Sequence, residues 1–211
     1  MKMLSKEILE KQKAIHTATE IYQQPEVWQE LIQSYVNSSD QINKFLESIY
    51  TKHEQVRVIF AGAGSSAFVG DTVVPALNKN KPAHVQFEAI ATTDIVSNPT
   101  EYLYQEVPTI MVSFARSGNS PESVATVALG KQLISNFYQV VITCNKDGQL
   151  AENVKNDKNA ITFLTPERAH DQALAMTSSF SCMLLASFLI FTRQHEDTYH
   201  LESLVKNGEL L

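Results

Sequence analysis

The sequence predicts an α/β fold in which α-helices precede a doubly wound, five-stranded parallel sheet. Three observations lead to this prediction. The apolar residues before residue 52 recur at helical spacing. Five short runs rich in β-branched residues follow that point. Helix-compatible stretches separate most of these runs, which is typical of repeated βαβ crossovers.

Two helices are expected at the start of the chain, over residues 5–22 and 25–50, where apolar side chains recur every three or four residues. Pro25 suits the first turn of the second helix, because a missing N–H costs nothing there. The second stretch also has more aromatic side chains than one helical layer over a sheet needs, so we expect a homo-oligomer. These aromatic residues are Trp28, Tyr35 and Phe45.

The strands are expected where β-branched residues cluster, and helices are expected between them. Residues 90–108 contain turn formers and only a brief helical pattern, so this crossover should be partly irregular, and the sequence does not give the strand order. The expected strands are 56–61, 83–90, 109–114, 138–143 and 160–164, and the expected helices are 66–78, 121–136, 149–155 and 174–193.

The 211 residues contain no internal repeat and no low-complexity linker. A chain of this length can bury about 70% of its unfolded surface as one unit. We therefore assign residues 1–52 to an N-terminal helical segment, residues 53–195 to the sheet domain and residues 196–211 to a C-terminal helical tail.

Composition excludes several classes of function. Lys and Arg number 17 against 23 Asp and Glu, and no basic cluster offsets the net charge of −6, so nucleic acid is not an expected partner. No apolar run approaches a membrane span and no secretory signal is found, so we expect a cytoplasmic protein without membrane contact. Cys144 and Cys182 are expected to be small buried hydrophobes. The histidines lack ligand spacing, so we expect no metal and no cofactor.

Three loops rich in hydroxyl groups follow predicted strands: a first loop (62–67), a second loop (113–123) and a third loop (175–180). The carboxyl ends of parallel strands form one rim, where helix N-termini offer N–H groups and positive dipole ends to anions. The candidate ligand residues are Gly64, Ser65 and Ser66 in the first loop, Arg116, Ser117, Gly118, Asn119 and Ser120 in the second, and Thr177 and Ser178 in the third.

Ser120 can cap a helix that begins at Pro121, and a plain capping role is the alternative reading for each serine and asparagine in these loops. Hydroxyls and amides without matching lysines bind a phosphate ester through directed hydrogen bonds and helix dipoles. The pattern therefore favours a small phosphorylated metabolite over a polyphosphate.

A dinucleotide-binding domain is a lesser alternative. Gly62, Gly64 and Ala67 have the spacing of a Rossmann fingerprint, and Glu88 stands about twenty residues further on, where a ribose-binding acid would be. This reading leaves the second and third loops unexplained. A P-loop is excluded, because no Gly-Lys-Ser or Gly-Lys-Thr follows a glycine-rich loop.

The three loops resemble the phosphosugar signature of the SIS (sugar isomerase) domain family. Within this family, residues 113–123 and 91–96 resemble the AgaS branch, described as tagatose-6-phosphate ketose/aldose isomerase or galactosamine-6-phosphate deaminase. The resemblance implies a flavodoxin-type sheet, a phosphate held by the second loop, and a first loop that faces the sugar or its phosphate. It also implies that the third loop touches sugar oxygens. The implied phosphate ligands are Ser117, Asn119 and Ser120, and the residues implied to face the sugar are Ser65, Ser66, Thr177 and Ser178.

The chain departs from its relatives in two ways. Many relatives carry Ser-x-Ser-Gly-x-Thr in the second loop, whereas Ala115 here removes one hydroxyl and Arg116 introduces a charge. Proteins of the AgaS branch usually contain two modules, and this chain has room for the first module only. Residues 196–211 could therefore begin a connector to a second module. Acid and base groups in such proteins often come from that module or from a neighbouring subunit.

An isomerase or deaminase of this kind moves a proton between C1 and C2 through an enediol or enolamine. The catalytic residues are not identified by the sequence, and the candidates near predicted strand ends are Glu88, Asp94, His170 and Asp171. Each could instead be a solvated loop residue. The alternative function is a non-catalytic module that senses a sugar phosphate. The sequence leaves open which sugar phosphate is bound.

Overall fold

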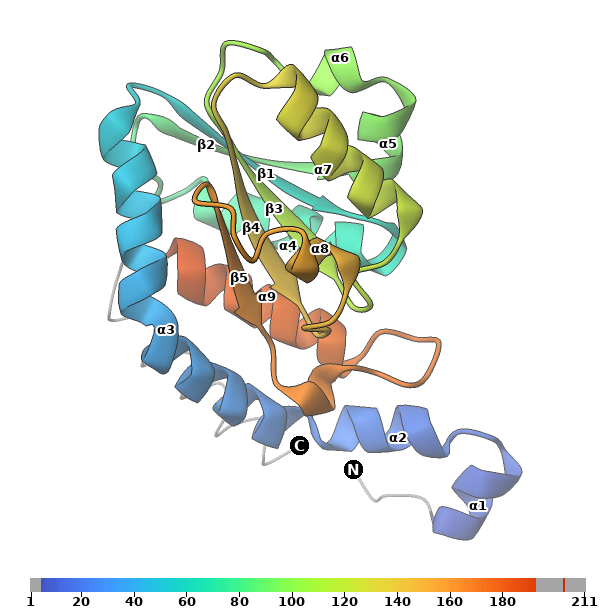
Figure 1. The fold of residues 1–211 in the computed structure, drawn as a ribbon. Helices are drawn as coiled ribbons and strands as arrows, with labels where there is room; N and C mark the ends of the chain where they lie inside the picture. Colours follow the sequence, from blue (N-terminus) through green and yellow to red (C-terminus); the bar gives the residue numbers. More distant parts are fainter. Residues whose placement is uncertain (1–4, 193–202, 204–211) are drawn as a thin grey trace.

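Five parallel strands form a single sheet in the computed structural model, which describes residues 5–192 and residue 203 (Figure 1). The strand order is β2-β1-β3-β4-β5, so the predicted five-stranded, flavodoxin-type sheet is confirmed. The central strands β1, β3 and β4 are buried along their whole length, which explains their continuous apolar runs. The strands are β1 (Val56–Gly62), β2 (Val85–Ala91), β3 (Thr109–Ala115), β4 (Phe137–Thr143) and β5 (Ala160–Leu164).

Helices cover both faces of the sheet. Successive strand side chains point to opposite faces, and in the buried strands the side chains on both faces are apolar, so each face packs against helices. Val58 and Phe60 belong to the core under α3, α4 and α9, whereas Ile59 and Ala61 belong to the core under α5 and α7. The helices on the first face are α3 (Gln24–Lys52), α4 (Ala67–Leu77) and α9 (Ser178–Phe191). The other helical elements are η1 (Gly64–Ser66), α5 (Thr92–Ser97), α6 (Pro99–Tyr102), α7 (Pro121–Leu133), α8 (Gln149–Glu152) and η2 (Glu167–Ala169).

The predicted single helix over residues 5–22 is wrong. The chain instead forms α1 (Lys6–Lys11) and α2 (Ile15–Tyr22). Lys13 has a φ of 55°, in the left-handed region, where an α-helix of L-residues does not continue. Apolar spacing continues through this point, so periodicity alone does not reveal the break. Figure 1 shows α1 and α2 extending away from the start of α3.

The aromatic side chains that favoured a homo-oligomer are partly buried against the core of this chain. Trp28, Tyr35 and Phe45 all pack against the main core within the chain. The Trp28 indole donates a hydrogen bond to Ser181 Oγ at 2.8 Å, and the Tyr35 ring meets the edge of Phe163. The homo-oligomer stays a prediction.

Several other predictions concern the described part of the chain. Within residues 5–192, no helix is long and apolar enough to cross a membrane, and no three His, Cys, Asp or Glu side chains gather as metal ligands. Cys144 and Cys182 are buried free thiols, as predicted, and burial raises the pKa of Cys144 to about 12. Apart from residue 203, the predicted tail over 196–211 lies outside the described residues.

Candidate functional site

The first and second loops begin side by side at the carboxyl edge of the sheet. They follow β1 and β3, which are paired through contacts such as Ala61 with Ser113. The chain reverses its winding direction between these two strands. In open α/β sheets, such a switch point is where ligand crevices form.

The first loop turns sharply over its own backbone. A Cβ atom on Gly62 would lie 2.5 Å from the carbonyl group of Ser66, so only glycine fits there. Gly64 and Ser65 are exposed, whereas Ser66 is buried and donates to the Met176 sulfur at 3.7 Å. The structure therefore presents Ser65 at the rim and directs Ser66 toward the 171–177 segment.

The second loop presents two exposed polar side chains around a glycine. Gly118 has a φ of 73°, and this turn leaves Ser117 and Asn119 exposed on either side. The Asn119 amide N–H donates to Ser117 Oγ at 3.3 Å, and Asn119 Oδ1 accepts from the Gln149 amide at 2.8 Å. The loop is thus held in shape by its own polar groups and by the start of α8.

The start of α7 has no side-chain cap, contrary to the role predicted for Ser120. Ser120 occupies the N-cap position, but its hydroxyl donates to Ser123 Oγ at 2.6 Å instead of accepting from the helix backbone. Pro121 follows as the first helical residue. The first-turn amides of α7 and the positive end of its dipole therefore face the second loop, an arrangement suited to binding an anion.

A fourth segment supports the site, and sequence reasoning missed it. It follows β4, where Asn145 Nδ2 donates to the carbonyl of Ser117 at 2.8 Å. A Cβ atom on Gly148 would lie 2.5 Å from the same carbonyl oxygen. The signal in the sequence is an Asn-x-x-Gly turn directly after a central strand.

The polar groups of the third loop form hydrogen bonds with other parts of the protein. Asp171 is buried, and its carboxylate accepts hydrogen bonds from the backbone amides of Thr177, Ser178 and Ser179 at 2.8–3.1 Å. The Thr177 hydroxyl donates to the same carboxylate at 3.0 Å. The Ser178 hydroxyl donates to the backbone carbonyl of Glu20 at 2.6 Å. Both predicted ligand hydroxyls of this loop are therefore used in internal hydrogen bonds.

Arg116 connects the second loop to the 171–177 segment. Its Nη1 atom donates to the carbonyl of Ala173 at 2.8 Å and to that of Leu174 at 3.4 Å. Together with the contact between Ser66 and Met176, these bonds bring the 171–177 segment against both switch-point loops. The structure thereby brings the three predicted loops together: Ser66 of the first loop contacts Met176 of the third, and Arg116 of the second bonds to the residues that lead into the third.

The four candidate acid or base groups do not gather in one place. The Asp171 carboxylate caps α9 by accepting hydrogen bonds from the backbone amides at its start, and the Glu88 carboxylate forms an ion pair with Arg57. Asp94 and His170 are exposed, on segments that follow β2 and β5. These two strands are at opposite edges of the sheet, about 19 Å apart at the usual strand spacing.

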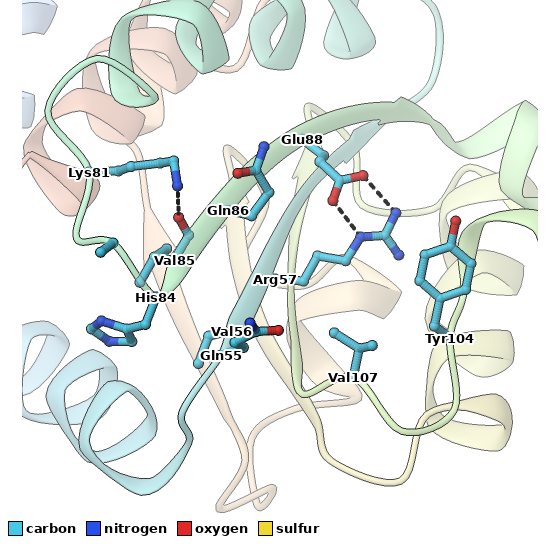
Figure 2. A pocket seen from close by; sticks show the side chains of 11 residues that line it. Gln55, Val56, Arg57, Lys81, His84, Val85, Gln86, Glu88, Tyr104 and Val107 are labelled. Atoms are coloured by element: carbon cyan, nitrogen blue, oxygen red, sulfur yellow. Dashed lines mark hydrogen bonds and ion pairs between the residues drawn. The ribbon is translucent and has the colours of Figure 1, made fainter.

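Glu88 belongs to a separate pocket at the amino end of the sheet (Figure 2). Arg57 is 6% exposed and pairs with both oxygens of Glu88 at 2.6 and 2.7 Å, while the Tyr104 ring lies 4.6 Å from the guanidinium carbon. The pocket has a volume of about 330 Å³, and its other lining residues include Lys81 and His84. Because its carboxylate is held there, Glu88 does not reach the rim, and the dinucleotide reading is not favoured.

Several known proteins resemble this chain in sequence. The SIS domain family model matches residues 52–193. The chain is 43% identical over 190 residues to D-galactosamine-6-phosphate deaminase AgaS of Shewanella sp. (strain ANA-3), covering 90% of this chain and 49% of that protein. It is 41% identical over 175 residues to D-galactosamine-6-phosphate deaminase AgaS of Escherichia coli, covering 83% of this chain and 45% of that protein.

A solved structure shows the same architecture. Tagatose-6-phosphate ketose/aldose isomerase from Escherichia coli superposes with a TM-score of 0.87 at 36% identity, covering 92% of this chain and 52% of that one. The chain therefore spans about half the length of the relatives it matches. Together, the five-stranded sheet, the switch-point loops and the match over residues 52–193 show that this chain belongs to the SIS domain family.

Proposed function

We propose that this chain is the phosphosugar-binding module of an amino-sugar-phosphate deaminase or a ketose/aldose isomerase, and that galactosamine 6-phosphate is its first substrate to test. The observation that carries the proposal is the start of α7. It has no side-chain cap, and exposed donors surround it at the switch point. The names of the relatives at 43% and 41% identity support the choice of sugar.

The phosphate would bind where α7 begins. A dianion there accepts hydrogen bonds from first-turn amides, from Ser117 Oγ and from Ser120 Oγ, whose hydroxyl would turn from Ser123 to the phosphate, and the positive end of the helix dipole stabilises its charge. Arg116 is adjacent and has further N–H donors on Nε and Nη2. The exposed hydroxyl of Ser65 would face the sugar from the neighbouring first loop.

The chemical step is proton transfer between C1 and C2, and deamination adds attack by water and loss of ammonia. Asp94 and His170 are the exposed candidates in this chain. They follow strands at opposite edges of the sheet, so only one of them would reach the two adjacent carbons of a single substrate. The remaining acid or base groups would come from outside residues 5–192, in keeping with a chain half as long as its relatives.

A thermal-shift panel followed by calorimetry tests the proposal. Hexose and hexosamine 6-phosphates are compared with the unphosphorylated sugars and with NAD. We expect stabilisation by phosphorylated sugars only. The Ser117→Ala and Ser120→Ala variants should each lose about 1–3 kcal/mol of binding free energy, the usual value of a hydrogen bond to a charged group.

The matched control is Ser39→Ala, which removes an exposed hydroxyl bonded to the Val36 carbonyl on α3, far along the sequence from both loops. It should bind as tightly as the unsubstituted chain. Unchanged affinity in both rim variants, or stabilisation by NAD alone, would reject the proposal. Ammonia release or ketose formation from the best ligand then separates an enzyme from a non-catalytic sensor.

A further inference from the structure

Glu20, on α2, has a buried carboxylate at the back of the 171–177 segment. The residue is 6% exposed. Its Oε1 atom accepts hydrogen bonds from the amides of Gln172 at 2.6 Å and Ala173 at 3.0 Å. Its Oε2 atom is buried and has no hydrogen-bond partner among the described residues.

Ala173 is held from both sides. Its N–H donates to the Glu20 carboxylate, and its carbonyl accepts from Arg116 Nη1 at 2.8 Å. One residue thus lies between a carboxylate and a guanidinium, with its N–H toward the anion and its carbonyl toward the cation. Any shift of Ala173 changes the point to which Arg116 is anchored.

A purely structural contact would not need a charge at residue 20. The side-chain oxygen of a glutamine can also accept from two backbone amides, although a carboxylate oxygen forms the stronger bonds. A buried carboxylate with one unpaired oxygen costs free energy unless a nearby cation compensates for it. Arg116, on the far side of Ala173, is the cation connected to it in this way. The two groups bonded to Ala173 from opposite sides therefore point to a role for Glu20 that involves the guanidinium.

We propose that Glu20 is a positioning residue for phosphate binding, which acts through Ala173 to hold the Arg116 guanidinium beside the start of α7. This inference rests on the proposed function, because it requires Arg116 to contact the phosphate. Nη1 is occupied by the 171–177 segment, so the fork of Nε and Nη2 is the part of the guanidinium that would face the ligand. A planar fork of this kind matches two phosphate oxygens only when its orientation is fixed.

A double-mutant cycle measures this role by calorimetry with galactosamine 6-phosphate. We expect Arg116→Ala to weaken binding by about 10- to 100-fold, the range for losing a hydrogen-bonded charge. Glu20→Ala should weaken binding by about 10-fold, and Glu20→Gln, which keeps an acceptor for both amides, by about threefold. In the Arg116→Ala background, either change at Glu20 should alter affinity by less than about twofold.

The coupling separates positioning from simple support. If Glu20 only stabilised the fold, its substitution would weaken binding equally with and without Arg116, and that result would overturn the inference. Glu10→Ala removes an exposed carboxylate on α1 and is the matched control, expected to leave affinity unchanged. Glu20→Gln keeps the test available should Glu20→Ala not fold.

Failure of the inference differs from failure of the proposed function. If Arg116→Ala weakens binding and both Glu20 variants bind normally, the positioning role is wrong and the phosphate site stands. If the unsubstituted chain does not bind galactosamine 6-phosphate, or if Arg116→Ala binds it normally, the premise itself is wrong and the inference falls with it.

Discussion

Replacing Asp171 with asparagine should destabilise the fold, because this carboxylate is the cap of α9. Its Oδ2 atom accepts from the amides of Thr177 and Ser179 and from the Ser179 hydroxyl, at 2.8, 2.9 and 2.5 Å. Its Oδ1 atom accepts from the Thr177 hydroxyl and the Ser178 amide at 3.0 and 3.1 Å. Asparagine offers a single oxygen, so its NH₂ group must face at least one buried amide.

The magnitude follows from two losses. A buried N–H left without an acceptor costs about 1–3 kcal/mol. Loss of the negative charge at a helix N-terminus costs about 1 kcal/mol more. We therefore expect the free energy of unfolding to fall by about 3 kcal/mol, which lowers Tm by about 6–12 °C for a chain of this size.

Urea denaturation monitored by circular dichroism measures this loss, with Asp94→Asn as a control on an exposed carboxylate. A stability change below about 1 kcal/mol would refute the capping argument. If Asp171→Asn kept full stability while a turnover assay lost its signal, Asp171 would return to the list of acid and base groups.

Three further predictions concern other parts of the molecule. Gly118→Ala should cost about 1–2 kcal/mol in a urea melt, because alanine is strained at a φ of 73°, and it should weaken phosphosugar binding; a chain as stable as the original would contradict this. Glu88→Gln leaves the buried Arg57 guanidinium without its counter-charge and should cost about 3 kcal/mol of stability. Because this pair lies at the amino end of the sheet, calorimetry should show unchanged ligand affinity, and a large loss of affinity would place Glu88 in the site after all. Burial and the neighbouring Lys52 lower the pKa of His53 below its usual 6.5, so the unfolded chain takes up this proton first as the pH falls. The urea midpoint should therefore decrease below about pH 6.5, and His53→Gln should reduce that decrease; an equal decrease in both chains would assign it to other groups.

The sheet is the part of the fold that the sequence predicts best. The predicted and observed bounds of the fifth strand agree at 160–164. Three other strands differ by one residue at one end, and the second strand differs by two residues at its start and one at its end. A buried strand needs uninterrupted apolar and β-branched residues, so each strand can be recognised from its own short stretch of sequence. The break at Lys13 depends on one backbone angle, which leaves no trace in the apolar spacing of residues 5–22.

The sequence predicts which loops form the candidate site, but it does not predict which partners their side chains bond to. Parallel strands bring their carboxyl ends to one edge, so the first and second loops could be placed there from the sequence. The partners of Thr177 and Ser178 could not, because a hydroxyl near a helix start can face a ligand or the protein. Glu20 bonds to a segment about 150 residues away, and no local pattern marks such a pair.

The cap of α9 has a consequence for where an anion can bind. α7 and α9 both begin near the same edge of the sheet, and both would attract a negative group by their dipoles. At the start of α9, the Asp171 carboxylate already accepts the backbone amides. Because Asp171 is part of the chain, its effective concentration there is high, and a free anion does not displace it easily. The Asp171 carboxylate therefore occupies the anion position at the start of α9, whereas the start of α7 has no such side chain and can accept a free dianion.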